Sequence, residues 1–311
     1  MGLDHIFVPT YVVGFFIVLI VEIIIGTLTN GFIVFVNFHD WLRGKPLNTS
    51  DQLVVSLALS NTCASCANAA IIVCAVYYTD IFLVYYVFCT LYSIMSYCIF
   101  SSSWLSAWLC LFFCLKIISF KSGCFAWMKT KVATIVPWLI LLSQVLSFCL
   151  SIPFFFSFTQ VFEPNSTAET GTNYTSGVVV GYEMNSLYNF ISMFVNCFIP
   201  FLIVMITTGR IIASLHNHAR HMRQNMEDDR GPSVKAHQGA ARTMMSLLFL
   251  YLIFYVVELG IGFLTMLNPI FWICFVLIFS FPTVQSFIVI MGNVKLKQMC
   301  LKLLKNSGNK Q

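Results

Sequence analysis

Charged residues are scarce in this sequence. Of its 311 residues, 9% are charged and 59% are hydrophobic, whereas about a quarter of the residues of an ordinary soluble domain are charged. A soluble core of this size does not need so much apolar surface. The composition therefore excludes an ordinary soluble protein. It predicts an integral membrane protein with one transmembrane domain over residues 1–311.

Motifs of enzymes, metal sites and transporters are also absent. The sequence has no His-Glu-x-x-His, Gly-x-Ser-x-Gly or phosphate-loop pattern, and its six His residues lie outside the apolar runs. Cys63-x-x-Cys66 has the spacing of zinc ligands but lacks a second pair. The paired broken helices with charged midplane residues that secondary transporters favour are not found. We expect no enzyme, no cofactor, no metal site and no nucleic-acid partner.

Long apolar runs are what the sequence has instead. Each is long enough to cross about 30 Å of hydrocarbon as a helix, and the alternating strands of a membrane barrel are absent. The third run carries one charge, Lys116, and its excess length indicates a tilted central span. We predict an all-α membrane protein, a seven-transmembrane helix bundle, with spans near residues 12–36, 53–76, 87–118, 132–156, 186–212, 240–267 and 269–292.

The positive charges predict the orientation of the bundle. All 17 Lys and Arg residues lie in or beside the first, third and fifth connections or in the tail, which share one side. By the positive-inside rule that side is cytoplasmic, so we expect a plasma-membrane protein with its N-terminus extracellular and its C-terminus cytoplasmic. The glycosylation sequons at Asn165 and Asn173 lie in the fourth connection, which this orientation places outside.

Two segments outside the spans, the fourth connection and the C-terminal segment, carry further structural predictions. The connection over residues 157–184 contains no Cys that could pair with Cys89, so we expect a mobile extracellular lid. In residues 293–305 the apolar side chains recur at helical spacing and the Lys side chains lie largely on the opposite face. This pattern predicts an amphipathic C-terminal helix in contact with inner-leaflet membrane lipids. Cys300 on that helix is either palmitoylated or a plain interfacial thiol.

Two carboxyl groups lie within predicted spans, where ionisable side chains usually mark sites. Glu258 shares a helix face with Tyr251 and Phe254, and two hypotheses stay open for it: a counter-ion for a cationic ligand, or a protonated glutamic acid bonded to a neighbouring helix. We interpret Glu22 as structural, because the first span is usually peripheral. Trp104 and Trp108 share one face of the third run, where an aromatic stripe indicates either packing or recognition.

Short motifs along the whole chain resemble those of the vertebrate bitter taste receptors, the type 2 taste receptors, a family of seven-span G-protein-coupled receptors. Any one of these motifs is weak, but their order and spacing are specific. They are Asn30-Gly31-Phe32-Ile33, Ser56-Leu57-Ala58-Leu59-Ser60, Leu115-Lys116-Ile117, Pro200-Phe201, Pro232-Ser233, Phe281-Pro282 and Gly292-Asn293-Val294-Lys295-Leu296-Lys297-Gln298.

The resemblance implies an outer pocket for small bitter compounds and an inner face that activates a gustducin-type heterotrimeric G protein. The pocket residues it implies, together with the buried carboxyl group, are Trp104, Leu105, Trp108, Phe254, Tyr255, Glu258 and Phe275. The residues expected at the G-protein face are Leu115, Lys116, His218, His237 and Arg242. The alternatives are a vomeronasal type 1-like chemoreceptor for another ligand class, and a transporter or channel. Whether the receptor forms an oligomer stays open.

The chain departs from the family pattern inside the bundle. Asn61 stands where the family usually has Arg, and Gln285-Ser286 stands where it usually has His-Ser. The activation network implied by the resemblance joins Asn30, residue 61 and Ser286, so in this chain we expect that network to be neutral.

Overall fold

The computed structural model describes residues 10–118, 123–163, 178–224, 232–261, 264 and 268–308. Seven of the described helices are long and apolar enough to cross a membrane, which confirms the all-α seven-transmembrane bundle. A two-stranded antiparallel sheet, β1 (Phe158–Glu163) and β2 (Val178–Met184), was not predicted. The helical elements are α1 (Thr10–Leu42), α2 (Thr49–Tyr77), α3 (Thr79–Phe82), α4 (Tyr85–Ile117), α5 (Cys124–Thr130), α6 (Val132–Phe156), α7 (Ser186–Met193), the π-helical η1 (Phe194–Phe198), α8 (Ile199–Gln224), α9 (Pro232–Ile261), α10 (Pro269–Gly292) and α11 (Val294–Gly308).

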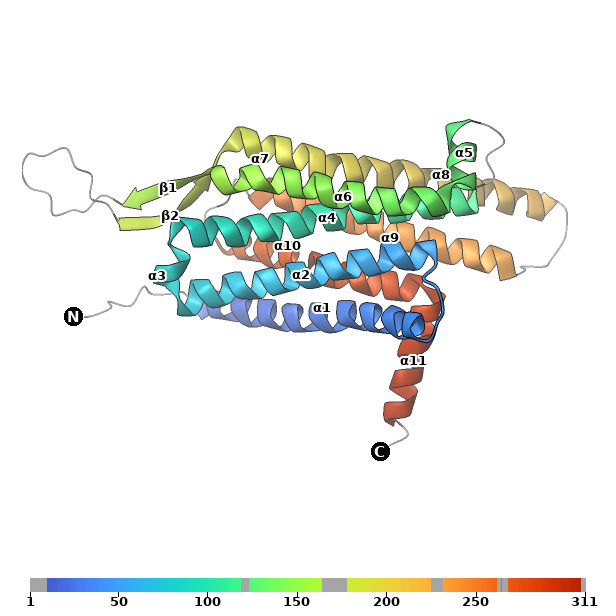
Figure 1. Cartoon of the computed structure of the whole chain (residues 1–311), viewed down its shortest axis with the longest axis horizontal. Helices are drawn as coiled ribbons and strands as arrows, with labels where there is room; N and C mark the ends of the chain where they lie inside the picture. Colours follow the sequence, from blue (N-terminus) through green and yellow to red (C-terminus); the bar gives the residue numbers. More distant parts are fainter. Residues whose placement is uncertain are drawn as a thin grey trace, which may run out of the picture.

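The two ends of the bundle carry different elements (Figure 1). The strands β1 and β2 extend from one end, which we call the hairpin end, and α3 lies there too. The short helix α5 and the helix α11 lie at the opposite end, which we call the α11 end, and α11 leaves the bundle at a steep angle. The ligand and G-protein residues predicted from the sequence can therefore be assigned to one end or the other.

Helix α4 is the central element of the bundle. Its 33 residues span about 50 Å at 1.5 Å per residue, more than a bilayer core requires. It packs against α2, α6 and α8, and a larger share of its most apolar segment is buried than in any of the other six spanning helices. The prediction of a central span is confirmed. Large apolar side chains such as Ile17, Trp138 and Phe249 instead lie exposed on the outside of the bundle, where lipid would surround them.

Glycine allows α10 to approach its neighbours closely at two points. A Cβ atom added at Gly26 of α1 would overlap the Thr283 hydroxyl of α10, and one added at Gly292 of α10 would overlap Thr243 of α9. At Gly31, by contrast, no atom lies within 4 Å of such a Cβ. Gly26 and Gly292 therefore set the spacing of α10 from α1 and α9.

Aromatic packing, with no disulfide, fixes the described ends of the fourth connection. Phe88 of α4 lies 5.1 Å from the ring of Phe158 in β1 and 4.3 Å from that of Tyr182 in β2. Cys89 beside it is a fully buried free thiol. The hairpin is thereby held on α4 across its two strands. Asn165 and Asn173 lie outside the described residues.

Lys295 joins α11 to the bundle. Its ammonium donates to Asn37 Oδ1 at 2.8 Å and lies 2.9 Å from a carboxylate oxygen of Asp40, both in α1, and 3.7 Å from one of Asp51 in α2. Asn293 caps the start of the helix by accepting from the Lys295 amide at 3.0 Å. The predicted C-terminal helix is therefore present and anchored to the first two spans.

Candidate functional site

A cavity of about 180 Å³ opens at the hairpin end of the bundle. It lies among α4, the two strands, the fifth-span elements α7 and η1, α9 and α10. Most of its wall is apolar, as is usual for small-molecule sites. The lining residues are Tyr92, Met95, Ser96, Ile99, Phe100, Phe158, Met184, Ser192, Met193, Cys197, Phe254, Glu258 and Ile278.

The π-helical turn η1 shapes one wall of this cavity. Met193 precedes the turn and Cys197 lies within it, and both side chains line the cavity. Asn196 points the other way: its amide donates to the Ser192 carbonyl at 3.0 Å, and its Oδ1 accepts from the Trp104 indole at 3.3 Å. Single π-helical turns of this kind occur frequently at functional sites.

Two of the predicted ligand residues, Phe254 and Glu258, line the cavity. They are one turn apart on α9 and face the same space, as their spacing indicated. Within the described part of the chain, Glu258 Oε2 is buried and has no hydrogen-bond partner. The same holds for the hydroxyl of Ser192, whose residue is 2% exposed.

The structure places Trp104 below the cavity. It lies 19 positions after Tyr85, the start of α4, or about 28 Å along the helix, whereas the lining residues of α4 lie between Tyr92 and Phe100. Trp104 is 7% exposed and stacks on Trp108 with ring centroids 5.5 Å apart. Through its bond to Asn196 it supports the η1 wall from beneath and does not line the cavity.

The other predicted ligand residues pack elsewhere in the bundle. Leu105 is fully buried in the core shared by α1, α2, α4, α6, α10 and α11. Tyr255 stacks on Phe201 of α8 at 6.1 Å, and Phe275 packs on Phe279 at 4.3 Å. None of these three side chains is among the lining residues of the cavity.

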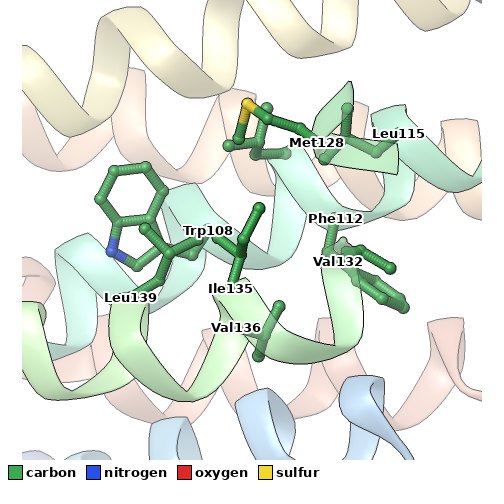
Figure 2. Close-up of a pocket in the computed structure, with 9 residues that line it drawn as sticks. Trp108, Phe112, Leu115, Met128, Val132, Ile135, Val136 and Leu139 are labelled. Atoms are coloured by element: carbon green, nitrogen blue, oxygen red, sulfur yellow. The ribbon is translucent and has the colours of Figure 1, made fainter. Parts of the chain in front are cut away.

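Trp108 and Leu115 both line a second, far smaller cavity between α4, α5 and α6 (Figure 2). Its volume of about 10 Å³ is that of a water-sized gap and too small for an organic ligand. The Trp108 indole donates to Ser143 Oγ of α6 at 2.8 Å. We had expected ligand contact from Trp108 and a groove role from Leu115; Figure 2 shows the Trp108 ring beside Leu139 of α6 and Leu115 on the side of Met128.

Most of the cavity lining was missed at the level of sequence. The lining residues of α4 have the spacing i, i+3, i+4, i+7 and i+8, so they form one stripe along the helix: Tyr92, Met95, Ser96, Ile99 and Phe100. That period was visible in the sequence and marked a common face. Which neighbour the face meets depends on the packing of α4 against η1, α9 and the strands.

A buried polar network lies between the cavity and the α11 end, and Gln285 of α10 is its centre. Gln285 Oε1 accepts from Asn61 Nδ2 at 2.8 Å and from Ser102 Oγ at 2.9 Å, and Gln285 Nε2 donates to Ser106 Oγ at 2.6 Å and to the Tyr251 hydroxyl at 3.4 Å. All five residues are at most 2% exposed. The network joins α2, α4, α9 and α10.

The network differs from the one expected among Asn30, Asn61 and Ser286. Asn30 donates to the carbonyls of Gly26 and Pro282, and Ser286 shares a hydrogen bond of 2.6 Å with Thr29. Asn61 instead bonds to Gln285 and accepts from Ser102 at 2.7 Å. Asn30 and Ser286 therefore fasten α1 to α10, while Asn61 belongs to the Gln285 network.

A chain of aromatic contacts joins the cavity to this network. The ring of Phe254, which lines the cavity, lies 4.6 Å from that of Phe281. Phe281 lies 5.2 Å from Tyr251, whose hydroxyl accepts from Gln285. The side chains of Phe254, Phe281, Tyr251 and Gln285 therefore form one continuous series of contacts from the cavity to the network.

The predicted G-protein residues lie at the α11 end, as far as their side chains are described. Lys116 is exposed, with its ammonium 5.9 Å from the centre of the Phe112 ring. Arg242 of α9 is exposed as well. His218 and His237 lie in α8 and α9, but their side chains are outside the described ones.

The seven spanning helices, with a ligand-sized cavity at one end and a buried polar network beneath it, define a multi-pass membrane protein of the seven-helix receptor class. Residues 8–307 match the family described as Taste receptor protein (TAS2R). Taste receptor type 2 member 3 of Papio hamadryas is 30% identical over 298 residues, which is 94% of this chain and 93% of the relative. Member 40 of Gallus gallus is 27% identical over 295 residues, 93% of each chain. The chain belongs to the taste receptor type 2 family, the bitter taste receptors among the G-protein-coupled receptors, which sets the vomeronasal and transporter alternatives aside.

Proposed function

We propose that the hairpin-end cavity binds small bitter compounds and that their binding activates a gustducin-type G protein at the α11 end. The observation that carries this proposal is the continuous contact from Phe254 in the cavity through Phe281 and Tyr251 to Gln285. A ligand that binds better to one arrangement of these side chains shifts the population towards it. The α11-end termini of α8 and α9 then separate and admit the G protein.

The distribution of charge supports the orientation that this function needs. Among the described cations, Lys45, Lys116, Arg210 and Arg242 lie near the α11 end, as do those of α5 and α11. The positive-inside rule then puts that end in the cytoplasm and the hairpin end outside, with the N-terminus extracellular in the plasma membrane. In this orientation Asn165 and Asn173 are glycosylation sites, and α11 lies on the inner leaflet with Cys300 near the lipid headgroups.

Lys116 and Arg242 are the described residues best placed to contact the G protein. Both are exposed at the α11 end, and they come from α4 and α9. We include His218 and His237 by their positions in the helices. Leu115 supports this surface from within the bundle, since its side chain lines the same small gap as Met128.

The experiment is intracellular calcium release in cells that express the chain with a gustducin-type chimeric G protein, screened against a panel of bitter compounds. Phe254→Ala should lower the potency of every active compound at least about tenfold, because it removes an aromatic wall of the cavity. Phe249→Ala is the matched control, since Phe249 is on the same helix but 65% exposed to the outside. Equal responses of the two variants, at equal surface expression, would place the ligand elsewhere. Calcium release without the G protein would contradict the coupling.

A further inference from the structure

The wall of the hairpin-end cavity contains two polar atoms that form no hydrogen bond within the described part of the chain. Glu258 Oε2 and Ser192 Oγ are both buried, and neither has a hydrogen-bond partner among the described residues. Both residues line the cavity, one from α9 and the other from α7. Buried polar groups are nearly always hydrogen-bonded, so an unsatisfied pair in one cavity needs an explanation.

The structure favours one of the two hypotheses for Glu258, the counter-ion for a cationic ligand. A structural glutamic acid would bond to a neighbouring helix, but the described part of the chain offers Oε2 no such bond. An unpaired carboxyl group among apolar side chains is costly to bury, and a ligand that pairs with it removes that cost. Glu22 Oε2 is also buried without a partner among the described residues, but Glu258 lines the cavity and Glu22 does not, so a ligand in the cavity can pair with Glu258 alone of the two.

The charge of the lining points to one class of ligand. Glu258 is the one carboxyl group among the lining residues, and none of them is Lys, Arg or His. Among the described lining residues there is thus a counter-ion for a cation and none for an anion. Four aromatic rings, those of Tyr92, Phe100, Phe158 and Phe254, also line it, and such rings attract a cation and stack on an aromatic ligand.

The size of the cavity limits the ligand further. An apolar protein cavity of about 150 Å³ takes up benzene, so the 180 Å³ found here fits one aromatic ring with a short chain. We propose that this cavity selects small protonated amines carrying one aromatic ring, with the Glu258 carboxylate as their counter-ion and the Ser192 hydroxyl accepting a hydrogen bond from the ammonium. The inference deepens the proposed function and rests on it.

Two pairs of probes of equal size test the charge alone: 2-phenylethylamine against 2-phenylethanol, and benzylamine against benzyl alcohol. Calcium release is recorded from the full chain, from Glu258→Gln and from Glu22→Gln, with surface expression measured for each. Glu22 is the matched control, because it is also a carboxyl group within a span but does not line the cavity. In the unaltered chain each amine should be at least about 30-fold more potent than its alcohol, the range found when one partner of a buried charge pair is removed.

That preference should disappear in Glu258→Gln and persist in Glu22→Gln. Equal potency of amine and alcohol in the unaltered chain, a preference that survives Glu258→Gln, or silence to both amines would each overturn the proposal. If Glu258→Gln does not reach the cell surface, the potency of the amines is measured in Ser192→Ala instead. This change should lower amine potency about threefold to tenfold, the worth of one hydrogen bond, and unchanged potency would overturn the proposal.

The proposed function has its own readout in the same cells. If the amines fail while other bitter compounds still act and still depend on Phe254, the amine proposal falls and the receptor site stands. If no compound in the bitter panel acts through Phe254, the proposed site falls with it.

Discussion

Asn61 of α2 and Gln285 of α10 form a buried amide pair, with Asn61 Nδ2 donating to Gln285 Oε1 across 2.8 Å. Both side chains are at most 1% exposed, and Ser102 bonds to both of them. In the family pattern these two positions usually hold Arg and His. Here two neutral amides satisfy each other, so the centre of the bundle needs no charge.

This pair predicts strong coupling between the two positions. Asn61→Ala and Gln285→Ala should each destabilise the receptor by about 1–3 kcal/mol, because each removes the buried amide–amide hydrogen bond together with that side chain's bond to Ser102. The double variant should cost less than the sum of the two. Thermal denaturation in detergent measures the three values. Asn37→Ala, at the α11 end, is the control and should be additive with Gln285→Ala; additivity of the Asn61 and Gln285 changes would contradict the pairing.

The close approach of α1 to α10 predicts opposite outcomes for two glycines of one helix. Gly26→Ala should lower thermal stability and surface expression, because the new methyl group overlaps the Thr283 hydroxyl. Gly31→Ala should leave both unchanged or raise them, because its methyl group meets no atom and alanine favours a helix by about 1 kcal/mol. Equal effects of the two changes would show that α1 and α10 are not packed this closely.

The position of Trp104 beneath η1 predicts how agonist potency responds to its replacement. Trp104→Phe removes the indole donor to Asn196 and keeps an aromatic ring, so potency should fall by a similar factor, about threefold to tenfold, for every agonist. Trp108→Phe, which loses its bond to Ser143 away from the cavity, should leave potency unchanged. Losses that differ widely among agonists would instead indicate direct contact between Trp104 and the ligand.

The anchoring of α11 depends on one ammonium group. Lys295→Ala removes a hydrogen bond to Asn37 and ion pairs with Asp40 and Asp51, so the free energy of unfolding should fall by about 1–3 kcal/mol. Hydrogen exchange in α11 should also quicken. Lys297→Ala, an exposed position on the same helix, should change stability by less than about 0.5 kcal/mol. Unchanged exchange in Lys295→Ala would mean that lipid contacts alone hold α11.

The seven spans were predictable because hydrocarbon imposes one solution on long apolar runs. The hairpin was not, since β1 contains the polar residues Thr159, Gln160 and Glu163 and depends on aromatic contacts with Phe88, distant in the sequence. The same holds for the fifth span. Its apolar run looked continuous, while the structure divides it at the π-helical turn η1.

The lining of the candidate cavity was predictable only at a residue that is unusual within a membrane span and at its neighbour one turn away. Glu258 could be identified because a carboxyl group within a membrane span is energetically costly and usually marks a site. Phe254 could be identified because it lies one turn away on the same helix face. The ligand role of Trp104 stays a prediction; its side chain is not among the lining residues of the cavity, because depth along α4 depends on where that helix begins, and it begins at Tyr85. The central place of Gln285 rests on contacts with three other helices, which no local pattern contains.

The central claim is that ligands act from the hairpin-end cavity, and filling that cavity tests it most directly. Ser96 is a small buried residue on its α4 wall, so Ser96→Phe would fill part of the cavity with a ring. The control is Leu141→Phe on α6, where the side chain is 51% exposed on the outside of the bundle. The measurement is the concentration dependence of calcium release at matched surface expression. Ser96→Phe should lower the potency of every agonist at least about tenfold, and Leu141→Phe should leave potency unchanged. Unchanged potency in Ser96→Phe would show that agonists do not act from this cavity.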